Sequence, residues 1–192
     1  MIRTFGLKSS YSPIVKVGDG VYKVCWDYIE IKDPVYAELT EEQKEQEAAG
    51  EIIERTKIDE IDTEYCTYMC EYIYGNITIT DVKKLITDWY NNETKYQILT
   101  GFAWNNNSVW LSEENQHDFS EALRTANSDS SILPVTMKIG EKEDMTPIYA
   151  VFETVEELDE FCNSVFIYIN NTLKDGWQKK DSVDWSLYQI PA

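Results

Sequence analysis

Alternating apolar and polar positions predict β-strands in the first third of the chain. Residues 13 to 32, "PIVKVGDGVYKVCWDYIEIK", hold two runs rich in β-branched and aromatic residues around a Gly-Asp-Gly turn, which predicts a hairpin. We expect Pro34 to end the second strand. The segment 63–75, "TEYCTYMCEYIYG", also alternates and is expected to join the hairpin in a small antiparallel sheet. One face of this strand would carry Cys66, Tyr68, Cys70, Tyr72 and Tyr74.

A polar segment separates these strands. Thr40 and Gln43 have the spacing of a capping box, and good helix formers follow them. Between residues 41 and 51 the only non-polar positions are Ala48, Ala49 and Gly50, so a helix here would lack a face to bury. We interpret residues 38–62 as an exposed acidic helix or tether. Residues 1–37 and 63–79 would then form a small N-terminal β unit.

A helical pattern begins near residue 80. Val82, Leu85, Ile86 and Trp89 recur at the spacing of one helix face, and Thr80 is the expected N-cap. A short turn or helix through "NETKYQIL" would follow.

The last hundred residues repeat one plan, in which two short strands precede an amphipathic helix. The first copy is 101–111 with a helix over 113–126; the second is "ILPVTMKIG" and "MTPIYAVFE" with a helix over 155–174. Thr154 and Glu157 form a capping-box pattern, and Asp175-Gly176 predicts the helix end. The predicted fold is therefore α+β, with short antiparallel hairpins each followed by an amphipathic helix, and 80–192 as the C-terminal domain.

The charge balance restricts the partners. Thirty-five acidic against 17 basic residues give a net charge of −18, whereas nucleic acids and anionic membrane surfaces are bound through clustered Lys and Arg. We therefore expect neither partner. No stretch approaches the ~20 apolar residues of a membrane span, and the N-terminus lacks the apolar core of a secretion signal. The four cysteines are accordingly expected to be free thiols in a reducing compartment.

None of the usual catalytic or cofactor motifs is present in the sequence. Cys66 and Cys70 lie ~13 Å apart if they occupy one strand, too far for one metal, and are interpreted as structural thiols. Helical projection places His117, the only histidine, on the solvent side of its helix, and no serine or cysteine nucleophile motif accompanies it. Phosphate-binding glycine loops and calcium-loop motifs are missing, although a Ca²⁺ site of another kind stays open. With 35 acids, no pair of carboxylates can be singled out for a hydrolase. We expect no enzyme, no cofactor and no metal.

The stretch "FAWNNNSVWL" (102–111) is the clearest candidate site. Trp104 and Trp110 flank three asparagines, a combination that suits sugar stacking or a protein interface. The alternative is that both indoles pack the following helix onto the hairpin. The residues predicted to form an interface or to bind a ligand are Trp104, Trp110, Asn105, Tyr68, Tyr72 and Trp177.

Three segments of the chain resemble a known family. "GFAWNNNSVWLSEENQHDFSEAL", "LPVTMKIG" and "FETVEELDEFCNSVFIYINNTLKDGWQKKDSV" are similar to a functionally uncharacterised domain of about a hundred residues from tailed-phage and prophage genes. That domain occurs often in tail or tail-fibre loci, notably in gut Bacteroides-type genomes. The resemblance covers residues 80 to 190 and leaves the acidic segment and the Tyr-rich strand unexplained. The family has no known catalytic residues, so none is transferred.

The resemblance implies a virion or prophage component that works by assembly, made in the host cytoplasm and plausible as a tail protein. We expect other virion or prophage proteins as partners, with a homo-oligomer as an open alternative. Two alternatives to this function remain. One is a tail-fibre assembly chaperone or adaptor that is absent from the mature particle, and the other is a carbohydrate-binding or hydrolase module that uses the Trp–Asn hairpin.

Overall fold

The computed structural model describes residues 1 to 191, which divide into two compact units. Met1–Lys83 and the chain from Asp184 onward form the N-terminal unit, and Lys84–Val183 form the C-terminal unit. Helices and antiparallel strands occur together, which confirms the predicted α+β class.

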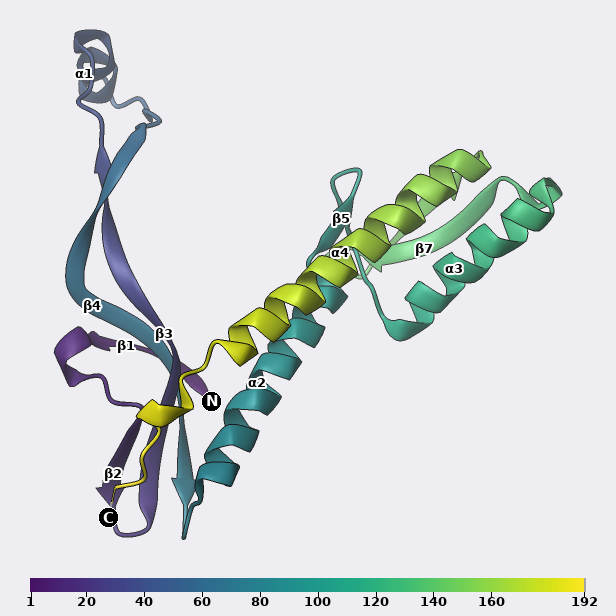
Figure 1. Cartoon of the computed structure of the whole chain (residues 1–192). Coiled ribbons are helices and arrows are strands. Elements are labelled where there is room, and N and C mark those ends of the chain that lie inside the picture. Colours follow the sequence, from purple (N-terminus) through teal and green to yellow (C-terminus); the bar gives the residue numbers. More distant parts are fainter. Residues whose placement is uncertain (192) are drawn as a thin grey trace. The chain divides into compact units, whose positions relative to one another are not determined.

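The N-terminal unit is built on a four-stranded sheet (Figure 1). Its strands lie in the order β1 (Ile2–Leu7), β4 (Lys57–Tyr74), β3 (Val21–Tyr36) and β2 (Ile14–Gly18), and each neighbouring pair is antiparallel. The predicted hairpin is the β2–β3 pair, whose turn places Gly20 at a φ of +63°, a conformation that favours glycine. The expected small antiparallel sheet is therefore confirmed, with β1 added at its edge.

Strands β3 and β4 both extend beyond the predicted limits. The expectation that Pro34 ends β3 is wrong, because Pro34 pairs with Glu60 and the strand continues to Tyr36. Here β3 has β4 as its only neighbour, so the missing N–H of proline can face the open edge. Residues 57 to 62 of the predicted tether belong to β4. Helix α1 (Glu41–Ala48) lies in the connection that leads from β3 to β4, and its predicted Thr40–Gln43 capping box is confirmed.

One face of the sheet carries a cluster of thiols and tyrosines. Cys25 pairs with Cys70 across β3 and β4, and both are buried together with Cys66 and Tyr68. Tyr11 and Tyr28 pack against this cluster. Of the predicted strand face, Cys66, Tyr68 and Cys70 are therefore buried, whereas Tyr72 and Tyr74 remain exposed.

The C-terminal unit contains two hairpins, each followed by a helix, as the sequence predicts (Figure 1). Its elements are α2 (Ile79–Thr100, of which the first residues belong to the N-terminal unit), β5 (Phe102–Trp104), β6 (Asn107–Val109), α3 (Glu113–Ser128), β7 (Val135–Glu141), β8 (Pro147–Phe152) and α4 (Val155–Asp181). The backbone N–H of Trp110 donates to Ile139 O at 2.8 Å, which joins the end of the first hairpin to β7.

The core of this unit is centred on one side chain of α4. Phe161 is fully buried, and its ring contacts those of Trp104, Phe119 and Phe152 at centroid distances of 5.3, 4.9 and 5.1 Å. These three aromatics come from β5, α3 and β8. A single helix face therefore gathers both hairpins and α3 into one apolar core.

The helix ends are only partly as predicted. Ser112 and Thr154 cap α3 and α4 as expected, accepting from the backbone N–H of Asn115 and Glu157. The cap of α2 is Thr78 rather than Thr80, because Thr78 exchanges hydrogen bonds with Asp81 in a capping box. Helix α2 also continues without interruption through the segment for which a turn or short helix was expected.

Helix α4 does not end at Gly176, as the sequence predicted, but continues to Asp181. A Cβ on Gly176 would lie 2.1 Å from Thr94 Oγ1 and 3.0 Å from Thr94 Cβ. The glycine therefore permits close approach of α4 to α2 and is not a helix terminator.

The segment from Asp184 returns to the N-terminal unit, whereas the sequence placed it in the C-terminal domain. The hydroxyl of Tyr188, which is buried, donates to the backbone oxygen of Cys25 at 3.1 Å. This contact joins residues that are 163 positions apart, so no local sequence signal reveals it.

Candidate functional site

A cleft of about 570 Å³ opens on the C-terminal unit beside the first hairpin. Its polar and aromatic wall comes from the β5–β6 turn, from β8 and from α4. These lining residues are Trp104, Asn105, Asn107, Tyr149, Glu157 and Glu160. The apolar lining includes Phe152 and Ile139 of the core, so the cleft lies directly over the packed interior.

The asparagines are fixed by the geometry of the turn. Asn105 and Asn106 have φ angles of 48° and 63°, in the left-handed region that asparagine tolerates better than most residues. The side-chain amide of Asn107 donates to the backbone oxygen of Asn105 at 3.1 Å. The three consecutive asparagines therefore make a two-residue hairpin turn possible and hold two amide side chains at the cleft.

The aromatic wall consists of one anchored ring and one exposed ring. Trp104 is half-buried, and its ring meets Phe161 edge to face at an interplanar angle of 77°. Tyr149 is 60% exposed on β8. Trp104 therefore packs the hairpin onto α4 rather than onto the helix that follows it, and it also lines the cleft.

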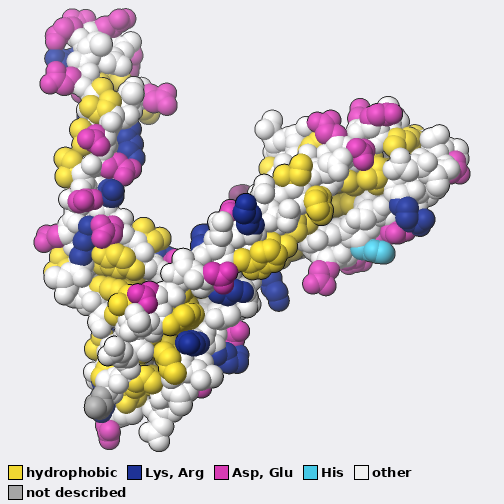
Figure 2. All heavy atoms as spheres, viewed as in Figure 1, with side chains coloured by type: hydrophobic (Ala, Val, Ile, Leu, Met, Phe, Trp, Pro, Cys, Tyr) yellow, Lys and Arg dark blue, Asp and Glu magenta, His cyan; other side chains and the backbone are white. Residues whose placement is uncertain are grey.

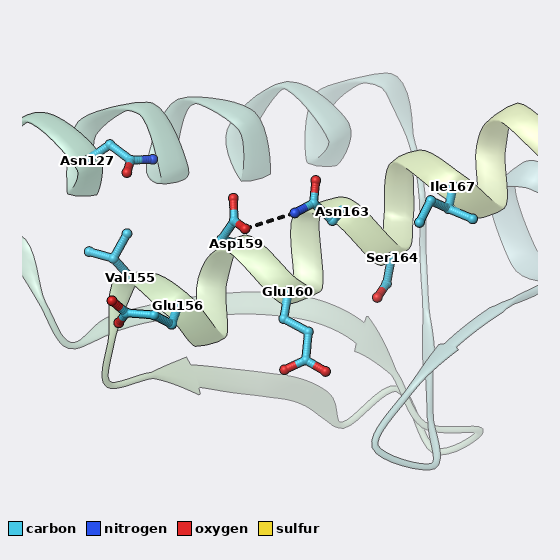
Figure 3. A pocket seen from close by; sticks show the side chains of 8 residues that line it. All are labelled: Asn127, Val155, Glu156, Asp159, Glu160, Asn163, Ser164 and Ile167. Carbon is cyan, nitrogen blue, oxygen red and sulfur yellow. Dashed lines mark hydrogen bonds between the residues drawn. The ribbon is translucent and has the colours of Figure 1, made fainter.

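Helix α4 supplies two carboxylates. Glu157 lies in its first turn and accepts from the backbone N–H of Glu153 at 2.9 Å, whereas the capping box predicted from the sequence required the N–H of Thr154. Glu160 is exposed and makes no hydrogen bond or ion pair with the described residues. Figure 3 shows Glu160 on the side of α4 away from α3, opposite the hydrogen-bonded pair Asp159 and Asn163.

A second groove, of about 620 Å³, also runs along α4, and Glu160 lines it as well as the first cleft (Figure 3). It is lined by acidic and amide side chains, among them Glu156, Asp159, Asn163 and Asn127. Within residues 1 to 191, no group of three or more His, Cys, Asp or Glu side chains is arranged to hold a metal ion. The groove has no aromatic wall, so it offers less specific recognition than the first cleft.

The structure brings together only Trp104 and Asn105 of the six predicted site residues. Trp110 is half-exposed and lines a separate hollow of about 130 Å³ with Leu99 and Gly140. Trp177 is exposed near the end of α4. Tyr68 and Tyr72 belong to the N-terminal sheet, where Tyr68 is buried and Tyr72 is half-exposed. These residues do not form one site.

Four residues of the polar and aromatic wall were not predicted from the sequence: Asn107, Tyr149, Glu157 and Glu160. Asn107 was recognisable, since it completes the asparagine run. Glu157 was assigned only to helix capping, and Tyr149 and Glu160 carry no local signal. They lie near Trp104 because β5 and β8 both pack against Phe161 of α4. Tyr149 and Glu160 are roughly 45 and 56 positions from Trp104 in the sequence, so no local pattern reveals this proximity.

The thiols of the N-terminal sheet have the properties of structural groups. Burial raises the pKa of the Cys25 thiol to about 11, and the pKa of Tyr11 to about 12. Cys66 donates to Gly6 O, and Cys70 lies 3.2 Å from the Thr4 hydroxyl. A nucleophilic cysteine needs a thiolate, so the protonated, buried Cys25 does not suit that role. His117 is exposed on α3, as the helical projection predicted.

A third candidate surface is the hairpin arm, which we define as residues 30 to 64. Beyond the reach of β1 and β2, the strands β3 and β4 pair only with each other and carry α1 at their end (Figure 1). Every residue of the arm is at least partly exposed. The arm holds 13 acidic and 4 basic residues. Figure 2 shows its acidic side chains interspersed with apolar ones.

No helix among residues 1 to 191 is long and apolar enough to cross a membrane. No protein family model matches the chain, and neither the curated proteins nor the solved structures contain a similar one. The resemblance of residues 80 to 190 to the phage domain therefore stays a prediction.

Proposed function

We propose that this protein is a non-enzymatic phage or prophage component, structural or needed for assembly, that acts by binding other proteins of the particle. The hairpin arm is the observation that supports a binding function. The assignment to a virion, with the tail as its place, rests on the resemblance of residues 80 to 190 alone.

The arm has the physical features of a protein-binding element. A two-stranded hairpin without further packing is marginally stable in water, because it buries too little apolar surface to offset its ordering entropy. Ile52, Ile58 and Ile61 of the arm are 103%, 63% and 61% exposed. Burying one such side chain against a partner contributes about 1.5–3 kcal/mol. A partner that covers the arm would therefore order it and remove its isoleucines from water.

Charge indicates the chemistry of that partner. The arm carries a net charge of −9, half of the −18 of the whole chain. A basic partner surface would be attracted along the full length of the arm, and association would slow as salt is added. Arm-to-arm pairing of two copies would instead bring like charges together. The partner that fits best is a different protein with a basic surface and an apolar stripe.

The place of this protein in the particle can be tested by mass spectrometry of purified phage, from a host that carries the gene. A structural component should be detected reproducibly. Detection in lysates but not in mature particles would favour the assembly chaperone or adaptor and would contradict the virion assignment.

Two variants test the arm itself. Tyr36 pairs directly with Lys57, so Asn-Gly in place of residues 37 to 56 should close the hairpin with a two-residue turn. The second variant, Ile58→Thr with Ile61→Thr, keeps β-branched side chains but removes apolar surface. We expect both variants to fold and to bind the particle partner at least about tenfold more weakly.

Val17→Thr is the matched control for the isoleucine variant. Val17 is an exposed apolar residue of the same sheet outside the arm, and its substitution should leave partner binding unchanged. If the complex forms equally well with both arm variants, the arm is not the binding element.

A further inference from the structure

We propose that the cleft beside the Trp104–Asn107 turn binds one residue of a neutral carbohydrate. This inference does not depend on the proposed assembly function, because the cleft lies entirely in the C-terminal unit and the arm entirely in the N-terminal unit.

The cleft has the size and the aromatic wall that a sugar ring requires. A volume of about 570 Å³ falls in the range of small-molecule sites, which is about 300–1,000 Å³. Trp104 and Tyr149 both line it. The face of an aromatic ring is electron-rich, so it attracts the weakly positive C–H groups that cover one side of a pyranose.

The polar groups combine hydrogen-bond donors with acceptors. Asn105 and Asn107 offer amide N–H groups and amide oxygens, and Glu157 and Glu160 offer carboxylate oxygens. A sugar hydroxyl donates one hydrogen bond and accepts others, so a ring with several hydroxyls can match both kinds of group. Glu160 has no hydrogen bond or ion pair among the described residues, which leaves its carboxylate available to a ligand.

Charge and donor pattern disfavour the other ligand classes. None of the described lining residues is Lys, Arg or His, so an anionic ligand would meet only the two carboxylates. A guanidinium or ammonium group would be attracted by those carboxylates, but it has no acceptor for the amide N–H groups. A neutral hydroxylated ring can accept hydrogen bonds from the amide N–H groups and donate them to the carboxylates.

Several contacts hold the site in place before any ligand arrives. Trp104 is fixed by its edge-to-face contact with the buried Phe161. The bond from Asn107 to the Asn105 backbone fixes the turn, and Glu157 is held by the Glu153 N–H. Pre-organised groups lose less conformational entropy on binding, which favours recognition of a small ligand.

Binding can be tested with the full chain on an array of neutral oligosaccharides that covers hexoses, 6-deoxyhexoses and N-acetylhexosamines. Titration of the methyl glycoside of the preferred sugar by NMR would follow. We expect saturable binding that changes less than about twofold between low and high salt, because the ligand carries no charge to be screened.

Two variants at exposed positions report on the site without disturbing the core. Tyr149→Ala removes an aromatic face, and Glu160→Gln removes a charged acceptor with little change in shape. Each should weaken glycoside binding about tenfold. The matched controls are Glu156→Gln, from the second groove on the same helix, and Trp177→Ala, an exposed aromatic outside the cleft.

Three outcomes would overturn the proposal: no binding to any neutral glycan on the array at millimolar concentration, glycan binding that survives both cleft variants, or a salt-sensitive preference for arginine-containing peptides over sugars. Loss of the arm, by contrast, should leave glycan binding intact, so failure of the assembly function would be seen separately.

Discussion

At the scale of single residues, Gly176 shows how packing can override a local sequence signal. Asp175-Gly176 has the composition of a helix end, yet α4 passes through it. The missing side chain is needed because Thr94 of α2 occupies the space where a Cβ would lie. A glycine that serves close packing and one that ends a helix look the same in the sequence.

The close contact with Thr94 predicts that Gly176→Ala lowers the stability of the protein instead of raising it. Glycine to alanine inside a helix ordinarily stabilises by roughly 0.5–1 kcal/mol. Here the new Cβ would lie 2.1 Å from Thr94 Oγ1, so we expect destabilisation by about 1–3 kcal/mol from overpacking. Urea unfolding followed by circular dichroism would measure the change.

The double variant Gly176→Ala with Thr94→Ala provides the control. Removing the threonine hydroxyl and methyl should recover part of the loss, so the two effects should be less than additive. An increase in stability on Gly176→Ala alone would show that the contact does not constrain α4.

At the scale of elements, the sequence predicted most of the secondary structure because its signals are local. Thr40, Ser112 and Thr154 cap helices through hydrogen bonds that span three residues, and the Asp19-Gly20 turn joins adjacent strands. Predictions failed where a third element decides the outcome. Pro34 stays in a strand only because one edge of β3 is open, which depends on the order of strands in the sheet.

The candidate site was predicted less completely for the same reason. The asparagine turn and Trp104 are neighbours in the sequence, and both were identified. Glu160 and Tyr149 reach the cleft through the packing of α4 and β8 around Phe161. Trp110 shares the hairpin with Trp104, yet it lines a different hollow. Sequence proximity therefore identified one wall of the cleft, whereas the structure places Trp110 outside it.

The buried face of the N-terminal sheet predicts a loss of stability at alkaline pH. The pKa of Cys25 rises from 9.0 to about 11, and that of Tyr11 from 10.0 to about 12, because burial disfavours their charged forms. In the unfolded chain both groups ionise at lower pH. The stabilisation from neutral burial is therefore complete below pH 9 and is lost as pH rises through about 11 for Cys25 and about 12 for Tyr11.

For Cys25, which is 2% exposed, a shift of this size corresponds to about 2–3 kcal/mol in the free energy of unfolding. Denaturant titrations at successive pH values would measure the decline, and Cys25→Ala should reduce the decline between pH 9 and about 11, to which Tyr11 also contributes above pH 10. A variant with the same pH profile as the parent chain would rule out this thiol as the cause.

At the scale of the whole molecule, each unit has its own pattern of contacts along the chain. Every residue of the core around Phe161 belongs to the continuous segment Lys84–Val183. The N-terminal unit, in contrast, needs residues from both ends of the described chain, since Tyr188 is buried there and bonds to Cys25. The charge is also uneven, with half of the net −18 on the arm.

This organisation predicts that a fragment of residues 78 to 183, which retains the Thr78 cap, folds without the rest of the chain. We expect a cooperative thermal transition and dispersed amide resonances, because no buried residue of its apolar core is removed. The reciprocal fragment, residues 1 to 83, lacks Tyr188 and should unfold at a lower denaturant concentration than the same unit in the full chain. Equal stability in both contexts would contradict a structural role for the segment after Asp184.

The bond from Tyr188 to Cys25 also has a consequence for synthesis on the ribosome. Domains commonly fold in the order in which they emerge, starting at the N-terminus. In this chain we expect the reverse order, since all core residues of segment 84–183 are present before Tyr188, which completes the earlier sheet, has been synthesised. Until Tyr188 is in place, the face of the nascent sheet around Cys25 is more exposed than in the finished protein. A chaperone that recognises exposed apolar surface would bind the chain best during this interval.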